Sequence, residues 1–212
     1  MRESSPREKI LTSIRNALIN KVAATEKGQA TTRPVYHKIA DDLSVTFAES
    51  LNNAGGKFYY CAGVSDFQKG LKGLAEQMEW EYIFCQDKSL QKLLKDAHIP
   101  YRFSETHQVE AKAGITRCEY LVARFGSVVV SSKTGSGRKA HIIPDSHIVL
   151  AFTSQIVMEI RDAMAGLQQK YRGALPSMVS FITGPSRTAD IEKTLVMGAH
   201  GPRELFVFLI DT

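Results

Sequence analysis

The chain has 212 residues, which is enough to bury a full hydrophobic core and fits one α/β domain with a helical extension better than two domains. Its 27 basic and 22 acidic residues leave a net charge of +5, but no aromatic residues interleave with the basic clusters, so nucleic-acid binding is not indicated. The first residues lack the apolar core of a signal peptide, and no apolar run approaches the roughly 20 residues of a membrane span, so we expect a cytoplasmic protein without a membrane span.

The first predicted element is an amphipathic helix that begins at a capping-box sequence, Ser5-Pro-Arg-Glu8. Its apolar stripe is formed by Ile10, Leu11, Ile14 and Leu18. A polar, aperiodic stretch follows, so residues 1–33 are predicted to be a helical arm with its linker, and residues 34–212 to be the main domain. The apolar face of the arm needs a partner surface, either on the main domain or on another subunit, which is compatible with a homo-oligomer.

Helices and single apolar strands then alternate along the chain. The expected helices carry apolar stripes over 39–51, 67–78 and 90–94, and the expected strands are 57–61 and 81–85. The glycine pair Gly55-Gly56 is typical of the end of a helix. This alternation predicts an α/β fold with three layers, α/β/α, in which helices cover a mainly parallel sheet.

Two apolar strands are predicted in the middle of the chain, at 126–132 and 147–152. The Gly-x-Gly at 135–137 lies in their connection, but it lacks the third glycine of a nucleotide-binding loop. The connection is therefore interpreted as a hairpin-like loop rather than a phosphate cradle. A further helix is expected after the second strand, capped by Thr153 or Ser154.

The stretch from 178 to 197 carries chemistry as well as shape. Its pattern predicts a buried strand over 178–183, a tight turn at Gly184-Pro185, and a helix from Thr188 to Met197. The unpaired N–H groups and partial positive charge at such a helix start suit a carboxylate or phosphate. The sequence therefore favours a small anionic ligand at this junction.

Polar side chains in the same stretch are compatible with two interpretations, an anion-binding site or an ordinary helix cap. Ser186, Arg187 and Thr188 add hydrogen-bond donors beside the predicted helix start. Glu192 lies four residues after Thr188, so its carboxylate would stand on the same side of the helix. In the plainer interpretation Thr188 is only a cap, while Asp190 and Glu192 complement the helix dipole.

Cysteine and histidine spacing gives no local metal site. The three cysteines, Cys61, Cys85 and Cys118, are scattered and include no Cys-x-x-Cys pair, so neither a disulfide framework nor an iron–sulfur or zinc site is indicated. The six histidines show no His-x-x-x-His spacing. We therefore expect no metal and no cofactor in this chain.

The C-terminal part of the sequence resembles the signature of the LUD (lactate utilisation) domain family. The resemblance covers 181–192 and continues through 195–205, which resembles the family's helix, Gly-x-His-Gly-Pro turn and last strand. Further landmarks in the same order are Gly126 to Ser132, Arg138, the turn 144–148 and the stretch 154–157. The match extends over about the C-terminal half of the chain, and the N-terminal half agrees by pattern alone.

This resemblance implies the fold of the NagB/RpiA/CoA transferase-like superfamily. It also implies a role in oxidising L-lactate to pyruvate together with iron–sulfur partner proteins, which would carry the clusters that this chain lacks. The resemblance and the local pattern together assign Glu192 and His200 to proton handling, and Arg187 to holding a carboxylate. The expected ligand-binding residues are Gly184, Pro185, Ser186, Arg187, Thr188, Asp190, Gly126, Ser127, Glu119, Arg138 and His147.

One departure from the family concerns the residues before Gly126. Many members carry an acidic residue and a threonine there, whereas this chain has Arg124 and Phe125. The change indicates a divergent ligand or a binding role. Two alternatives therefore stay open beside the lactate-oxidation subunit: a stand-alone enzyme of sugar-phosphate or acyl-CoA type, and a non-catalytic assembly subunit whose arm docks partners.

Overall fold

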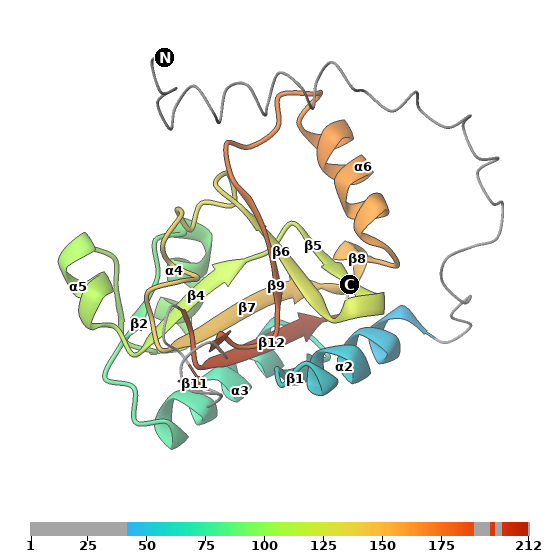
Figure 1. Ribbon diagram of the computed structural model, residues 1–212. Helices are drawn as coiled ribbons and strands as arrows, with labels where there is room; N and C mark the ends of the chain where they lie inside the picture. The colour runs from blue at the N-terminus through green and yellow to red at the C-terminus, as the bar shows by residue number, and fades with distance from the viewer. Residues whose placement is uncertain (1–41, 189–195, 198–200, 212) are drawn as a thin grey trace, which may run out of the picture. The chain divides into compact units, whose positions relative to one another are not determined.

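The computed structural model of the protein describes residues 42–188, 196–197 and 201–211 (Figure 1). The helical arm predicted for residues 1–33 lies outside the described residues. The same holds for the predicted boundary between residues 33 and 34.

The centre of the domain is a six-stranded parallel sheet with the strand order β1-β12-β7-β4-β2-β3. Its strands are β1 (Lys57–Cys61), β12 (Glu204–Ile210), β7 (Ser146–Phe152), β4 (Ala113–Arg117), β2 (Ile83–Phe84) and β3 (Tyr101–Arg102). Six of the seven residues are buried in each of the central strands β7 and β12. Such continuous burial is expected for parallel strands that are covered on both faces.

Helices cover one face of this sheet. They are α3 (Val64–Gln77) and α4 (Lys88–Asp96), and the short helix α5 (Glu105–Glu110) precedes β4. The buried stripe of α3 packs on the aromatic side chains of β12, where the ring of Phe208 stacks on Tyr59 with centroids 4.7 Å apart and meets Phe67 edge-on. The alternation of helices and strands in the sequence therefore predicted this helical layer correctly.

The opposite face is covered by α2 (Leu43–Asn53) and by a second sheet of four strands (Figure 1). This second sheet has the order β8-β5-β6-β9, with β8 (Ile156–Val157), β5 (Tyr120–Val122), β6 (Ser127–Ser131) and β9 (Val179–Thr183). Helix α6 (Ile160–Lys170) packs on its outer face through Ala163 and Leu167. The expected α/β fold with a mainly parallel sheet is confirmed, and the second sheet is an addition that the sequence pattern did not indicate.

The predicted hairpin between 126–132 and 147–152 is wrong. Strand β6 pairs with β5 and β9 in the second sheet, whereas β7 pairs with β12 and β4 in the main sheet. The intervening loop crosses from one sheet to the other. All residues of β6 and six of the seven in β7 are buried, and a continuous buried strand carries no local signal of which sheet it joins.

The helix expected from Thr153 or Ser154 begins later. Thr153–Gln155 forms a single 3-10 turn (η2), Ile156–Val157 pairs with β5, and α6 begins at Ile160. The Gln155 side chain explains the delay, because its Oε1 accepts from Phe152 N at 2.8 Å and its Nε2 donates to Cys118 O at 2.8 Å. These bonds tie the turn to the start of β5. A similar 3-10 turn, η1 (Ala123–Phe125), precedes Gly126.

The helix predicted from Thr188 to Met197 is wrong at both of its described ends. Arg187–Thr188 forms strand β10, which pairs antiparallel with Val196–Met197, strand β11. Residues 189–195 lie outside the described part of the chain. The N–H of Ser186 already donates to Pro202 O at 2.8 Å, so the turn after β9 is held by the segment before β12.

Candidate functional site

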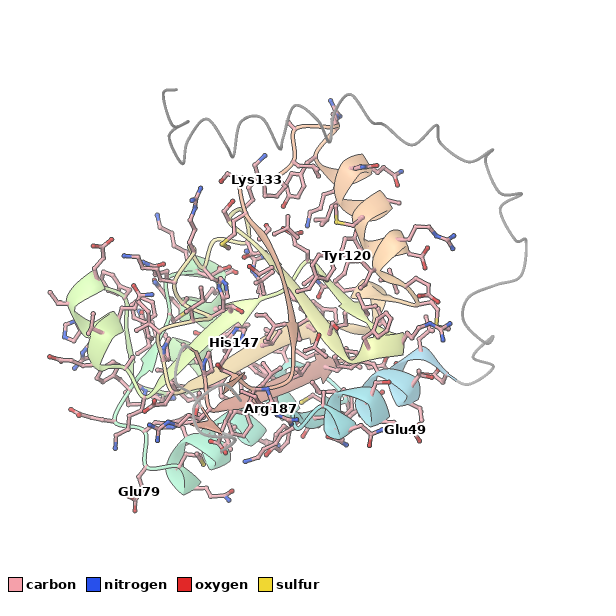
Figure 2. All side chains as sticks on the ribbon, in the orientation of Figure 1. Glu49, Glu79, Tyr120, Lys133, His147 and Arg187 are labelled. Carbon is pink, nitrogen blue, oxygen red and sulfur yellow. The ribbon has the colours of Figure 1, made fainter. Side chains whose placement is uncertain are left out.

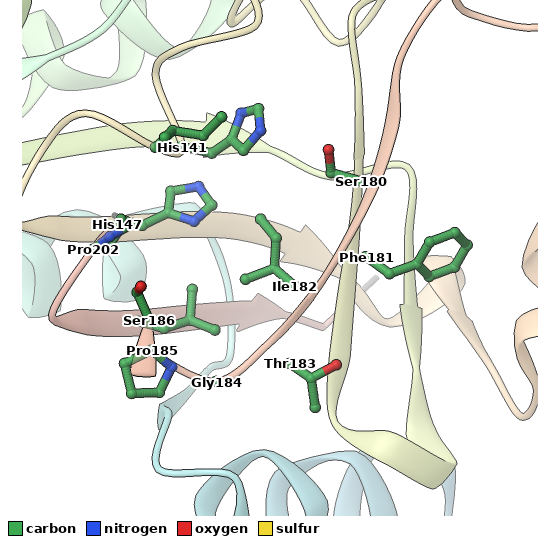
Figure 3. A pocket seen from close by; sticks show the side chains of 13 residues that line it. His141, His147, Ser180, Phe181, Ile182, Thr183, Gly184, Pro185, Ser186 and Pro202 are labelled. Atoms are coloured by element: carbon green, nitrogen blue, oxygen red, sulfur yellow. The ribbon is translucent and has the colours of Figure 1, made fainter. Parts of the chain in front are cut away.

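A cavity of about 300 Å³ lies beside the amino ends of β7 and β12 (Figure 3). Its lining includes His141, His147, Ser180, Gly184, Ser186 and Leu205. His147 and Leu205 are the second residues of β7 and β12, and they pair with each other in the ladder. Open α/β sheets ordinarily bind ligands at the carboxyl ends of their strands. This cavity is at the other end, where β9 of the second sheet passes over the main sheet.

Two buried imidazoles face this cavity (Figure 3). His147 is fully buried, and its Nε2 lies 2.8 Å from the hydroxyl oxygen of Thr116. The rings of His141 and His147 have centroids 6.1 Å apart. Within the described structure, neither Nδ1 of His147 nor Nε2 of His141 has a hydrogen-bond partner. Thr46, Gln108 and Ser136 each also bury one polar side-chain atom without a partner, but His141 and His147 differ from them because both line the same cavity, where a ligand can pair with the two rings.

Burial keeps both imidazoles neutral. It lowers the pKa of His147 to about 3, with a smaller contribution from the neighbouring His141. Burial also lowers the pKa of His141. Removing an imidazolium from water is costly, so neither ring carries a charge near neutral pH. Neutral imidazoles can donate through one nitrogen and accept through the other.

Of the predicted site residues that follow β9, some line the cavity and one points away from it. Gly184, Pro185 and Ser186 line the cavity. Gly184 has a φ of +76°, and a Cβ there would overlap the carbonyl oxygen of Ala54, so the turn requires glycine. Arg187 turns toward α2 instead, where its Nη2 donates to Ala54 O at 2.7 Å. A cation at a helix C-terminus is favourable, so in this structure Arg187 caps α2.

Gly126 and Ser127 do not line the cavity themselves, but both contact elements next to it. Gly126 has a φ of +61°, and a Cβ at this position would overlap the backbone of Leu51 in α2. Ser127 is buried, and its Oγ lies 2.7 Å from Oγ1 of Thr183, a lining residue. Gly126 therefore permits close packing of α2, while Ser127 fixes the side chain of Thr183.

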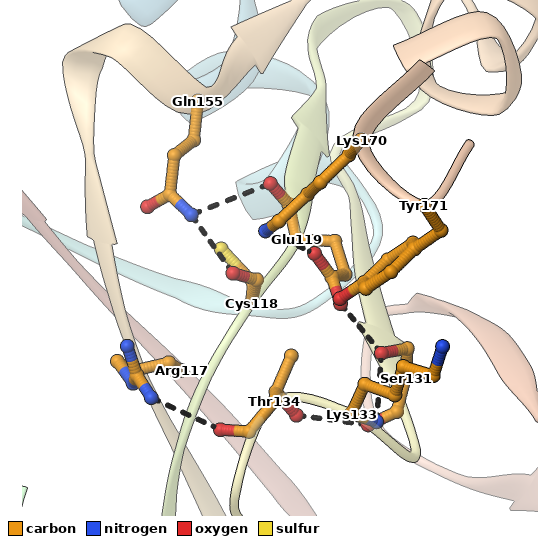
Figure 4. Close-up of polar contacts among 9 residues, drawn as sticks. All are labelled: Arg117, Cys118, Glu119, Ser131, Lys133, Thr134, Gln155, Lys170 and Tyr171. Carbon is orange, nitrogen blue, oxygen red and sulfur yellow. Dashed lines mark hydrogen bonds and ion pairs between the residues drawn. The ribbon is translucent and has the colours of Figure 1, made fainter. Parts of the chain in front are cut away.

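Glu119 belongs to a separate polar cluster between β5, β6 and α6 (Figure 4). Its Oε1 accepts from Ser131 Oγ at 2.5 Å and from Tyr171 OH at 2.7 Å, and its Oε2 accepts from Lys170 Nζ at 2.7 Å. Burial raises the pKa of Glu119, but the hydrogen bonds from Lys170, Ser131 and Tyr171 outweigh it, so the pKa falls below its usual value. The cluster thus holds an ionised carboxylate that fastens α6 to the second sheet.

Of the remaining predicted site residues, only Arg138 has a described side chain, and it does not line this cavity. Arg138 is on the exposed loop, where its Nη2 donates to Ser177 Oγ at 2.5 Å. The side chain of Thr188, and all of Asp190, Glu192 and His200, lie outside the described residues. Among the described residues of the expected site, some line the cavity, while Arg187 lies at the end of α2, Glu119 in its own cluster and Arg138 beside Ser177.

Two polar residues at the site were not predicted from the sequence: His141, which lines the cavity, and Thr116, whose hydroxyl contacts His147 from behind it. One signal was available at Gly114, because a glycine inside a strand often marks a close backbone approach. A Cβ at Gly114 would lie 2.7 Å from Ala140 O and 2.7 Å from Pro144 Cγ. The glycine lets the loop that carries His141 press against β4. No spacing pattern could have paired Thr116 with His147, because neighbouring strands bring them together.

The described residues contain no group of three or more His, Cys, Asp or Glu side chains that could hold a metal ion. Across the same residues, no helix combines the length and apolar character needed to cross a membrane.

Comparison with known proteins places most of the chain in one family. The family model described as "LUD domain" matches residues 45–210. Three similar proteins are each named Lactate utilization protein C. The protein of Geobacillus thermodenitrificans is 40% identical over 95 residues, covering 44% of this chain and 40% of that protein. The protein of Halalkalibacterium halodurans is 39% identical over 105 residues, covering 48% and 46%, and that of Bacillus subtilis is 36% identical over 104 residues, covering 48% and 43%. The matches thus span less than half the length of these relatives.

A solved structure supports the fold. The crystal structure of a DUF162 family protein from Deinococcus radiodurans superposes with a TM-score of 0.61 at 17% sequence identity. The match covers 79% of this chain and 96% of that one. At this identity the likeness concerns the fold alone.

Proposed function

Because the chain belongs to the LUD domain family, we propose that this protein takes part in lactate utilisation, the role that the names of its relatives state. The ligand in this proposal is a small 2-hydroxy carboxylate such as L-lactate. It binds in the cavity beside His141 and His147.

The observation that carries the proposal is the pair of buried ring nitrogens without partners, His141 Nε2 and His147 Nδ1, on residues that line one cavity. A 2-hydroxy carboxylate offers both a hydroxyl group, which donates and accepts, and carboxylate oxygens, which accept. Binding such a ligand would replace two costly unpaired atoms with hydrogen bonds. Apolar side chains such as Ile182 and Leu205 line the same cavity and would contact the methyl group.

The finer part of the proposal concerns the reaction. Oxidation of L-lactate to pyruvate removes two electrons and two protons. The electrons would pass to iron–sulfur partner proteins, as the family resemblance implies, and this chain would bind the carboxylate and handle protons. Glu192 and His200 remain the residues predicted for proton handling. Arg187, predicted from the sequence to hold the carboxylate, contacts Ala54 O at the end of α2 and does not line this cavity, so the proposal gives the carboxylate to the cavity histidines.

Isothermal titration of the purified chain with L-lactate tests the binding step. Saturable binding is expected, and His147→Gln and His141→Gln should each weaken it by about tenfold, which corresponds to one hydrogen bond of about 1.4 kcal/mol. The control is His98→Asn, because His98 is exposed, does not line this cavity and has a φ of +55° that asparagine tolerates. Unchanged affinity in both cavity variants would remove the proposed site.

The same titration separates the rival functions. Ribose 5-phosphate and acetyl-CoA represent the sugar-phosphate and acyl-CoA classes. Binding of either one in preference to L-lactate, together with turnover by the isolated chain, would favour a stand-alone enzyme. No binding of any of the three ligands would favour an assembly subunit.

A further inference from the structure

Among the described residues, the lining of the cavity beside β7 and β12 contains no acidic side chain, no lysine and no arginine. Its polar side chains are those of His141, His147, Ser180, Thr183 and Ser186, and the other lining residues are apolar, glycine or proline. An ionised carboxylate that leaves water for such a lining has a large desolvation cost unless a positive charge meets it. The ligand of the proposed function carries this negative charge at neutral pH.

The face of the main sheet behind the cavity does not supply the missing positive charge. In the strand ladder His147 on β7 is flanked by Gly114 on β4 and by Leu205 on β12, so the three positions lie on one face of the sheet. Thr116 is two residues further along β4 and contacts the ring of His147. Strand β9 (Val179–Thr183), which passes over this face, has no charged residue.

Charged residues at the amino ends of these strands lie in a separate hollow. The ones that line it are Lys112, Asp145, Arg203 and Glu204. Asp145 pairs with Arg203 at an N–O distance of 3.9 Å, and Glu204 pairs with Lys57 at 2.7 Å. None of these residues lines the cavity of the two histidines.

The loop that carries His141 has two basic residues of its own, and neither lines the cavity. Arg138 donates to Ser177 Oγ, and Lys139 is exposed. Tyr82 packs on the same loop, and its hydroxyl donates to a backbone carbonyl oxygen at 3.0 Å. Within the described lining, His141 and His147 are therefore the groups that can gain a positive charge, by taking up a proton.

Of the two rings, that of His141 is the better place for the proton. His147 is fully buried, its Nε2 is 2.8 Å from the hydroxyl oxygen of Thr116, and burial lowers its pKa to about 3. His141 is on a loop, is 5% exposed, and has a buried Nε2 without a partner. The ring centroids are 6.1 Å apart, and a charge on His141 lowers the pKa of His147, so one proton is taken up and not two.

We propose that the cavity binds a carboxylate together with one proton, which comes from the solvent and is held by the ring of His141, so that an imidazolium pairs with the carboxylate inside the protein. The inference rests on the proposed function for the identity of the ligand, a 2-hydroxy carboxylate. It makes binding of the substrate depend on pH.

The sign of the pH dependence follows from the two states of His141. Without an anion beside it the ring is neutral at pH 7, because burial lowers its pKa. A carboxylate beside the ring raises that pKa, since an opposite charge favours the protonated form. Between the two pKa values, binding takes up a proton, so the affinity falls as the pH rises through this interval.

Isothermal titration of the full chain with L-lactate at pH 6.5 and 7.5 tests the coupling. Repeating the titration at pH 7 in buffers with different heats of ionisation counts the protons taken up per ligand. We expect more than about half a proton per lactate at pH 7, and an affinity about three- to tenfold lower at pH 7.5 than at pH 6.5. Lactamide, the neutral amide of the same ligand, should bind without proton uptake.

His141→Gln keeps a polar side chain that cannot be protonated. This variant should bind L-lactate more weakly, with no measurable proton uptake and with equal affinity at the two pH values. His98→Asn is the control, because His98 is exposed and does not line the cavity, so both the affinity and the uptake should match those of the parent chain. Far-ultraviolet circular dichroism establishes that both variants fold.

Binding of L-lactate to the parent chain without proton uptake would overturn the proposal. Uptake that persists in His141→Gln would also overturn it, because the proton would then be held by another group, and so would equal uptake with lactamide. Failure of the proposed function looks different. In that case L-lactate gives no saturable heat at either pH, and the inference falls with it.

Discussion

Replacement of Glu119 by glutamine should destabilise the fold far more than an equivalent change at the surface. Glutamine has the shape of glutamate, but it loses the negative charge and places an amide NH2 where Oε2 stood. In the protein Oε2 faces Lys170 Nζ at 2.7 Å, so a donor would then face a donor. The two hydroxyl donors, Ser131 and Tyr171, already share Oε1, and they would keep that oxygen as a neutral, weaker acceptor.

The magnitude follows from burial. The Lys170 side chain is 52% exposed, so its ion pair contributes at most about 1 kcal/mol. The Glu119 side chain is 0% exposed, and leaving a buried donor unpaired costs a further 1–3 kcal/mol or so. We therefore expect Glu119→Gln to lower the free energy of unfolding by about 2–4 kcal/mol.

Glu204→Gln is the matched control. Glu204 pairs with Lys57 at the same N–O distance, 2.7 Å, but the two side chains are 29% and 51% exposed. The same chemical change there should cost less than about 1 kcal/mol. Equilibrium unfolding in urea at pH 7 measures both variants. Equal losses in the two would refute the argument that burial makes the Glu119 cluster a structural fastener.

The pH dependence provides a second check on Glu119. Its pKa is lower in the folded state than in the unfolded chain, so its contribution to stability is present above the unfolded value of about 4.3 and is lost as the pH falls through the folded value. The stability difference between the parent chain and Glu119→Gln should accordingly shrink below about pH 4.

Four further substitutions test the packing and the C-terminal segment. Gly126→Ala should lower the free energy of unfolding, measured in urea, by more than about 2 kcal/mol, because residue 126 has a positive φ and a Cβ there would overlap the backbone of α2. Gly73→Ala is the control: residue 73 is in α3 with open space around it, so the change should be neutral or should stabilise by up to about 1 kcal/mol. Phe208→Ala should cost about 3–5 kcal/mol by thermal or urea unfolding, and a loss below about 1 kcal/mol would contradict the tight aromatic core. Arg187→Ala should cost about 0.5–1.5 kcal/mol by removing the contact with Ala54 O, and an additional loss of about 2 kcal/mol in L-lactate binding would support the anion-binding role predicted from the sequence.

The layered fold could be predicted because buried faces appear in the sequence as a local pattern of apolar residues. The stripe of Phe67, Leu71 and Leu74 and the buried runs of β7 and β12 specify which faces are apolar. The sequence has no comparable pattern that shows which strands pair with each other. Nothing in the sequence of β6 distinguishes a neighbour in the main sheet from β9, to which it is joined over five residue pairs.

The candidate site was predicted in part for the same reason. The turn at Gly184 to Ser186 was found because a local conformation requires it. The helix predicted after this turn is absent at residues 188 and 196–197. Arg187 and Ser186 instead donate hydrogen bonds to the carbonyl oxygens of Ala54 and Pro202, which are distant in the sequence. His141 reaches the cavity through contact between separate elements, which no local pattern encodes.

A crystal structure of the chain grown with L-lactate tests most directly whether a 2-hydroxy carboxylate binds beside His147. We expect electron density for lactate in the cavity lined by His141 and Ser186, with a ligand oxygen within about 3.2 Å of His147 Nδ1. Lactate bound at another place on the protein, with this cavity holding water alone, would contradict the claim.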